Sequence, residues 1–170
     1  MPWQKGRPAS AERSDDGEKA YARALDRLAG RDYSSQELYE RLCRQFTGPA
    51  AAEAIARLLE LGLLDDEKYA AARAQSLQRA GKSRRAAAFA LRGRGLNDSQ
   101  IAQALEAAYT AGEEEPDPEL AAATALAAGR YRAKLAAGRR DLVAAALTRR
   151  GFPYPVVRAA LEAAQQQLEG

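Results

Sequence analysis

Histidine is absent from the 170-residue sequence, and Cys43 is the only cysteine. Without histidine, a Ser-His-Asp triad, a Cys-His dyad and histidine-ligated zinc are all impossible. A single cysteine cannot form an internal disulfide, and it suits a reducing compartment. We therefore expect a cytoplasmic protein without a disulfide framework, and with neither catalytic residues nor a metal site of these classes.

The sequence also has few β-branched residues and no long apolar run. Val, Ile and Thr together number nine, against 41 Ala and 20 Leu, and this composition favours helices over strands. No apolar stretch approaches the roughly 18 residues of a membrane span. The first residues lack the apolar core of a signal peptide. The composition predicts a soluble, all-α protein without a membrane partner.

The formal net charge of +3 conceals two strongly basic stretches. Residues 68–96 carry eight basic side chains and no acidic one, and residues 130–158 carry eight basic side chains with Asp141 as the only acid. Arginine predominates over lysine, and its planar fork binds phosphate or carboxylate in a bidentate manner. The two stretches are therefore candidate surfaces for nucleic acid or for an acidic protein.

Signals for helix starts follow one another along the chain. Ser34, Asp65 or Asp66, Ser83, and Asn97 or Asp98 each precede an apolar-periodic segment and suit an N-cap. Residues 84–108 also align without a gap on 140–164, so that Arg94-Gly95 falls on Arg150-Gly151. A looser copy in the first third suggests three tandem three-helix modules forming an elongated molecule that could curve. The expected division is a disordered tail over 1–17, modules over 18–64 and 65–111, an acidic proline-containing linker over 112–118, and a third module over 117–170.

Three segments of the chain resemble the RecX family, regulators of the bacterial recombinase RecA. They are LxxRxYSxxEL at 28–38, GLLDDxxYA at 62–70 and LxxRGL at 91–96, and the second is the most specific. The resemblance covers 20–109 well and the last third more weakly. It implies a string of three-helix repeats that binds the RecA nucleoprotein filament along its groove. It further implies inhibition of filament extension, ATP hydrolysis and strand exchange in DNA recombination, DNA repair and the SOS response.

The candidate partner-binding residues lie mainly on the helix expected after Ser83. Lys82, Arg85, Phe89 and Arg92 fall within roughly 80° of one another on a helical wheel, opposite the apolar residues of the same helix. Their counterparts in the third module are not basic or aromatic, whereas Arg84 and Arg94 recur as Arg140 and Arg150. We therefore interpret the recurring arginines as structural. The remaining candidates are Arg73, Arg79, Arg130, Arg132, Lys134 and Arg139.

Other interpretations remain open for these residues. The basic face could be a solvated surface with Phe89 packed against the next module. A sequence-nonspecific DNA-binding protein acting without RecA would carry similar patches. Asp65, Asp66 and Glu67 fit a helix start better than a metal site, and Cys43 fits a small core residue better than a nucleophile. We expect a non-enzymatic monomer that needs no cofactor, binds RecA filaments and binds free single- or double-stranded DNA weakly.

Overall fold

A computed structural model describes residues 12–170, and these residues form ten α-helices and no β-strand. The predicted all-α class is confirmed. Trp3 and the rest of residues 1–11 lie outside the described residues. Among the residues described, none of the helices has the length and apolar character needed to cross a bilayer.

The chain divides into two compact units, one ending at Tyr69 and the other spanning Ala70–Gly170. The first unit contains α1 (Gly17–Gly30), α2 (Ser35–Leu42) and α3 (Gly48–Glu60). Helix α4 (Asp66–Arg79) crosses the boundary. The second unit continues with α5 (Arg84–Arg92), α6 (Asp98–Tyr109), α7 (Pro118–Ala128), α8 (Arg132–Ala136), α9 (Arg140–Arg149) and α10 (Tyr154–Glu169). It therefore holds most of the residues of both the second and the third expected modules.

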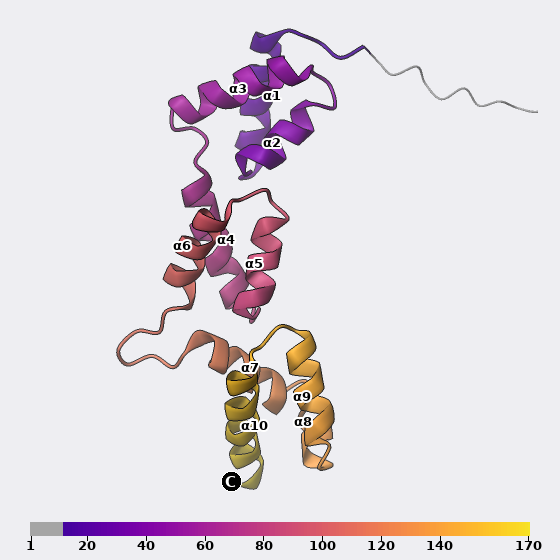
Figure 1. Cartoon of the computed structure of the whole chain (residues 1–170), viewed down its shortest axis with the longest axis vertical. Coiled ribbons are helices and arrows are strands. Elements are labelled where there is room, and N and C mark those ends of the chain that lie inside the picture. The colour runs from indigo at the N-terminus through magenta and orange to yellow at the C-terminus, as the bar shows by residue number, and fades with distance from the viewer. Residues whose placement is uncertain (1–11) are drawn as a thin grey trace, which may run out of the picture. The chain divides into compact units, whose positions relative to one another are not determined.

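In the first unit, α1 and α3 pack side by side around an alanine-rich core (Figure 1). Ala20 and Ala24 of α1 are fully buried, as are Leu38 of α2 and Leu58 of α3. Small residues let the helix backbones approach closely, and the leucines fill the space between them. Each helix begins with a side-chain cap: Asp16, Ser34 and Thr47 accept hydrogen bonds from backbone N–H groups three residues further on.

Residues 12–16, the described part of the segment before α1, are held against the first unit, so this part of the expected tail over 1–17 is ordered. The N–H of Ser14 donates to the carbonyl oxygen of Gln45 at 2.9 Å, and the N–H of Thr47 donates to the carbonyl oxygen of Ser14 at 2.9 Å. The hydroxyl of Thr47 also donates to Asp15 at 2.6 Å. These long-range bonds leave no periodic pattern in the sequence, which is why the composition of residues 12–16 suggested a tail.

In the second unit, α10 packs along α7, and α9 packs against α10 (Figure 1). Ala123 and Ala127 of α7 are buried with Val143 and Leu147 of α9 in one apolar core. The structure adds a helix to the three expected in this part of the chain, because α7 stops at Ala128 and the one-turn helix α8 follows. Gly129 forms the break, with a backbone that departs from the helical conformation at φ −101° and ψ −88°.

Candidate functional site

The second unit carries the predicted basic face on α5. Ser83 caps this helix by accepting a hydrogen bond from the N–H of Ala86 at 3.1 Å. Ala87 and Leu91 are fully buried on the inner side of the helix. Arg85, Phe89 and Arg92 lie on the opposite side and are exposed. Lys82 is exposed as well, but it precedes the N-cap Ser83 and therefore lies just outside the helix on which the sequence placed it. We call these four residues the α5 basic face.

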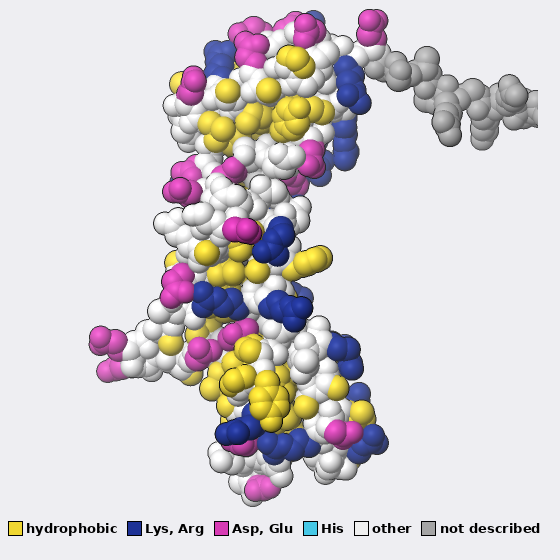
Figure 2. Space-filling model, in the orientation of Figure 1, with side chains coloured by type: hydrophobic (Ala, Val, Ile, Leu, Met, Phe, Trp, Pro, Cys, Tyr) yellow, Lys and Arg dark blue, Asp and Glu magenta, His cyan; other side chains and the backbone are white. Residues whose placement is uncertain are grey.

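Phe89 is 77% exposed, an unusual position for a phenylalanine. The alternative in which its ring packs against the next module is therefore wrong. Arg92 makes an ion pair of 3.5 Å with Asp98, but both side chains are largely exposed, so the pair holds Arg92 only weakly. Figure 2 shows Lys and Arg side chains, in dark blue, distributed over the surface of the second unit.

The start of α5 is joined to the end of α9 by a hydrogen bond and a close backbone approach. The hydroxyl of Ser83 donates to the carbonyl oxygen of Arg150 at 2.7 Å. Gly151 adopts φ +93°, and a Cβ atom built on it would lie 2.7 Å from the Ser83 hydroxyl oxygen. Only glycine combines this backbone conformation with such a close approach. The Arg150-Gly151 pair, recognised in the sequence as a repeat, thus brings the two helix ends together.

The recurring arginines make structural contacts. The Arg150 Nε donates to the Tyr131 hydroxyl at 3.0 Å, and this bond lowers the pKa of Tyr131. The guanidinium of Arg84 donates to Glu106 at 2.6 Å and holds the pKa of that carboxyl below its usual range. The backbone N–H of Arg84 donates to Glu119 of α7 at 2.9 Å. These contacts agree with the interpretation of Arg84 and Arg150 as structural.

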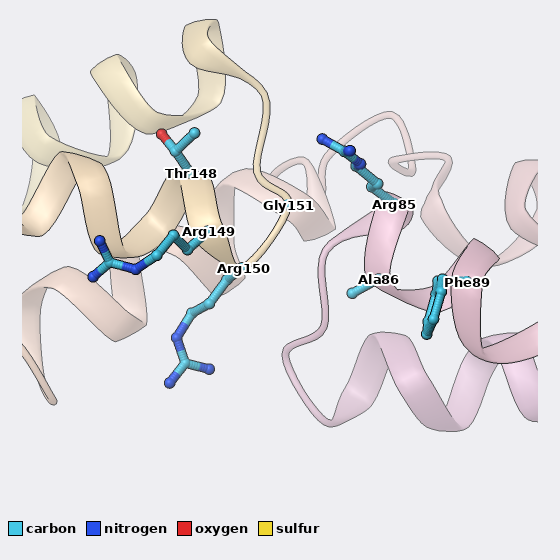
Figure 3. A pocket seen from close by; sticks show the side chains of 7 residues that line it. All are labelled: Arg85, Ala86, Phe89, Thr148, Arg149, Arg150 and Gly151. Carbon is cyan, nitrogen blue, oxygen red and sulfur yellow. The ribbon is translucent and has the colours of Figure 1, made fainter.

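A hollow of about 420 Å³ lies where α5 meets the end of α9. Its lining residues are Arg85, Ala86, Phe89, Thr148, Arg149, Arg150 and Gly151. Figure 3 shows Arg85 and Phe89 on α5, with Thr148, Arg149 and Arg150 on the opposite side. Two members of the α5 basic face are thereby combined with a second cationic element. We call this site the α5–α9 hollow.

The remaining predicted site residues are dispersed. Arg73 is half-buried in α4, and Arg79 is exposed in its last turn. Arg130, Arg132 and Lys134 are exposed at and before α8. Arg139 is exposed before α9, and its Nε lies 3.8 Å from Oδ1 of Asp141. None of these six lines the α5–α9 hollow.

Sequence reasoning missed Arg149 and Thr148. Both precede the recurring Arg150-Gly151 pair, and in the structure Gly151 adopts a positive φ just after α9. The sequence did not show that the start of α5 is the neighbour of this segment. The hydrogen bond between Ser83 and Arg150 spans 67 positions of the chain, so only the folded second unit brings Arg149 beside Arg85.

Asp65 and Asp66, at the start of α4, make contacts within the fold. Asp65 accepts a hydrogen bond from the N–H of Lys68 at 3.0 Å, which is an N-cap contact. Asp66 accepts from the N–H of Ser35 at 2.7 Å and from the Ser35 hydroxyl. Within residues 12–170, no group of acidic or cysteine side chains has an arrangement that could hold a metal ion.

Tyr109 provides a pH-dependent contact beneath the α5 basic face. Its hydroxyl donates to the carbonyl oxygen of Lys82 at 2.8 Å, and burial raises its pKa to about 12. An unfolded tyrosine has a pKa of about 10. Because the folded value is the higher one, this stabilisation is complete below about pH 10 and is lost as the pH rises towards 12.

We expect Tyr109→Phe to lower the free energy of unfolding by about 1 kcal/mol near pH 8, since one hydrogen bond is removed. The difference between wild type and variant should shrink at pH 11, where ionisation favours the unfolded wild type only. Urea denaturation at the two pH values measures this difference. A gap that stays constant or widens with pH contradicts the assigned contact.

Comparisons with known proteins agree with this fold. Family models described as the first and the second three-helix domain of RecX match residues 20–58 and 65–105. Regulatory protein RecX of Halorhodospira halophila is 36% identical over 149 residues, covering 86% of this chain and 88% of that protein. Regulatory protein RecX of a Mycobacterium species (strain JLS) is 38% identical over 91 residues, covering 52% of this chain and 49% of that protein.

Solved structures share the fold. The crystal structure of RecX from Lactobacillus salivarius has a TM-score of 0.73 at 22% identity, and the match covers 89% of this chain and 98% of that one. A second RecX crystal structure has a TM-score of 0.74 at 24% identity, with coverages of 86% and 73%. Because the Halorhodospira protein is matched over most of both lengths, the chain belongs to the RecX family of regulatory proteins.

Proposed function

We propose that this chain regulates the RecA recombinase by binding RecA nucleoprotein filaments. It inhibits filament extension, ATP hydrolysis and strand exchange in recombination, DNA repair and the SOS response. Membership of the RecX family of regulatory proteins supports this class of function. The observation that carries the proposal to particular residues is the exposure of the α5 basic face, with Phe89 at 77%.

The charge of this face suits a nucleoprotein partner. No acidic residue occurs between positions 68 and 96, so every charged side chain of α5 itself is positive. The carboxylates that reach this helix from other elements contact Arg84 and Arg92, and Arg85 has no acidic partner among the described residues. DNA phosphates attract such a surface through release of condensed counterions, and acidic protein surfaces attract it through charge complementarity. Exposed cations contribute little to folding, so they are free to serve binding.

The proposed activity is binding rather than catalysis. The protein acts as a monomer in the cytoplasm, and RecA is the enzyme whose turnover changes. The sequence has no glycine-rich phosphate loop and no histidine, in keeping with a regulator that hydrolyses no ATP itself.

An ATPase assay tests the proposal. We expect addition of the full chain at or below one molecule per RecA protomer to lower ATP hydrolysis by RecA on single-stranded DNA. The chain alone should release no phosphate from ATP. Unchanged RecA turnover over this range contradicts the proposed function.

The same exposed cations also favour a second candidate, a sequence-nonspecific DNA-binding protein that acts without RecA. The two candidates differ in affinity for free DNA. A salt titration that shows tight binding to free DNA, together with unchanged RecA turnover, supports the second candidate. Weak binding to free DNA together with inhibition supports the first.

A further inference from the structure

We propose that the α5–α9 hollow binds one nucleotide of single-stranded DNA, with the base stacked on Phe89 and its flanking phosphates contacted by Arg85 and Arg149. This inference rests on the proposed function, since it identifies the DNA strand as a part of the filament that the protein contacts. It adds a second wall, from α9, to the face that the sequence predicted on α5.

The two walls supply cations that are available for phosphate. Within residues 12–170, neither Arg85 nor Arg149 takes part in an ion pair or a side-chain hydrogen bond, and both are exposed. The lining contains no acidic residue. An arginine fork without an internal partner binds a phosphate oxygen pair with good geometry. The α5–α9 hollow is therefore chemically selective for anions.

Arg150 also lines the α5–α9 hollow, but its contacts are structural. Its Nε donates to Tyr131, and its carbonyl oxygen accepts from Ser83 at 2.7 Å. The bond from Ser83 holds the end of α9 against the start of α5, and the bond to Tyr131 ties the Arg150 side chain to the start of α8. Gly151 lies on the segment after α9, between the end of that helix and the start of α5, and in Figure 3 the Arg149 side chain extends away from α5, so that its guanidinium must turn about its flexible stem to reach a phosphate beside Phe89.

Phe89 gives the hollow its aromatic element. An exposed ring beside cationic side chains is the arrangement by which single-stranded nucleic acid is bound without sequence preference. Every base has a π-face, so stacking tolerates all four bases. The volume of about 420 Å³ falls in the range of small-ligand sites and suits one nucleotide better than a protein helix.

The hollow beside Tyr154 provides an internal comparison. Tyr154 is 75% exposed, so it offers a second accessible ring in the same unit. Its surroundings include Asp141 and Glu162 as well as Arg140 and Arg158. The two carboxylates offset the charge of the two guanidiniums, so this hollow attracts a phosphate less strongly than the α5–α9 hollow does. Tyr154→Ala is therefore a matched control for removal of an exposed aromatic ring.

The test measures binding of the full chain to two fluorescein-labelled strands by fluorescence anisotropy. One strand is oligothymidylate of about 15 nucleotides, a length typical of single-strand binding sites. The other has the same number of phosphates with abasic residues in place of the bases. Phe89→Ala should weaken oligothymidylate binding about fivefold or more, and should change abasic-strand binding less than about twofold. Phe89→Trp should retain wild-type binding, and so should Tyr154→Ala.

Arg149→Gln tests the second wall. It should weaken binding of both strands and reduce the salt slope of each by about 0.7 for every phosphate that residue 149 no longer neutralises. Thermal denaturation checks that each variant remains folded, as expected for exposed positions. Equal weakening of the two strands by Phe89→Ala, or no weakening, overturns the stacking assignment, and an unchanged salt slope in Arg149→Gln overturns the phosphate contact.

RecA turnover separates this inference from the proposed function. If the wild-type chain inhibits RecA but binds neither strand, the nucleotide site is wrong and the proposed function stands. If both strands bind as described but RecA turnover is unchanged, the site stands and the proposed function is wrong. If the chain binds an acidic peptide through Arg149 but not the strands, the hollow is a protein-binding site instead and the nucleotide site is wrong.

Discussion

Gly151→Ala is expected to lower the free energy of unfolding of the second unit by about 3 kcal/mol. An L-residue held at φ +93° costs about 1 to 2 kcal/mol relative to glycine. The added methyl group also collides with the Ser83 hydroxyl oxygen at 2.7 Å and must displace it. Displacement disrupts the hydrogen bond from Ser83 to Arg150, which contributes about 1 kcal/mol.

Gly138→Ala is the matched control for this prediction. Gly138 has φ +74°, and apart from its two neighbours in the chain no residue that the structure describes has an atom within 4 Å of the position that its Cβ would take. Only the backbone cost of about 1 to 2 kcal/mol should appear there. Urea denaturation followed by circular dichroism measures both variants. Equal destabilisation by the two substitutions would mean that the close approach between α5 and α9 contributes nothing to stability.

Alanine substitution of Lys82, Arg85 and Arg92 together is expected to abolish most of the inhibition of RecA while leaving thermal stability nearly unchanged. All three side chains are exposed, and within residues 12–170 only Arg92 of the three has an ion pair, a weak one of 3.5 Å to Asp98. If all three contact phosphate, the slope of log affinity against log salt should flatten by about 2. Filament binding at several salt concentrations and RecA ATP turnover measure these effects.

A variant with the same reduction in charge controls for long-range attraction. Arg13, Arg23 and Arg44 are exposed residues of the first unit without ion pairs among the described residues. Their joint replacement by alanine lowers the net charge equally but leaves the α5 basic face intact. Inhibition should be retained in this control. If both triple variants inhibit equally well, the α5 basic face is a solvated surface and binding depends on other residues.

The local features of the fold were predictable because their causes are local. Ser34, Ser83 and Asn97 cap the helices that their positions predicted, since a side-chain oxygen needs only the N–H two or three residues away. The burial of Ala87 and Leu91, with Phe89 on the other side, follows from the helical period alone. Three residues of the candidate site, Arg85, Phe89 and Arg92, could be recognised on that basis.

Features that depend on distant partners could not be predicted in this way. The pairing of Ser14 with Gln45 and Thr47 changed an expected tail into part of the first unit. Asp66, the first residue of α4, also accepts a hydrogen bond from the N–H of Ser35 at the start of α2. In each case the hydrogen-bond partner lies about thirty positions away in the chain, and no periodic pattern in the sequence indicates which residues pair.

By itself, the sequence determined the all-α class, the helix starts, the repeat that aligns Arg150-Gly151 with its counterpart Arg94-Gly95, and the exposed cations of α5. Helix propensity, the helical period of apolar residues and capping depend on neighbouring residues only, so they can be predicted from the sequence. Only the tertiary structure decided that Phe89 is exposed and that Arg149 shares a hollow with Arg85. The physical reason is that this hollow depends on one close backbone approach, at which Gly151 after α9 meets Ser83 and Arg85 at the start of α5.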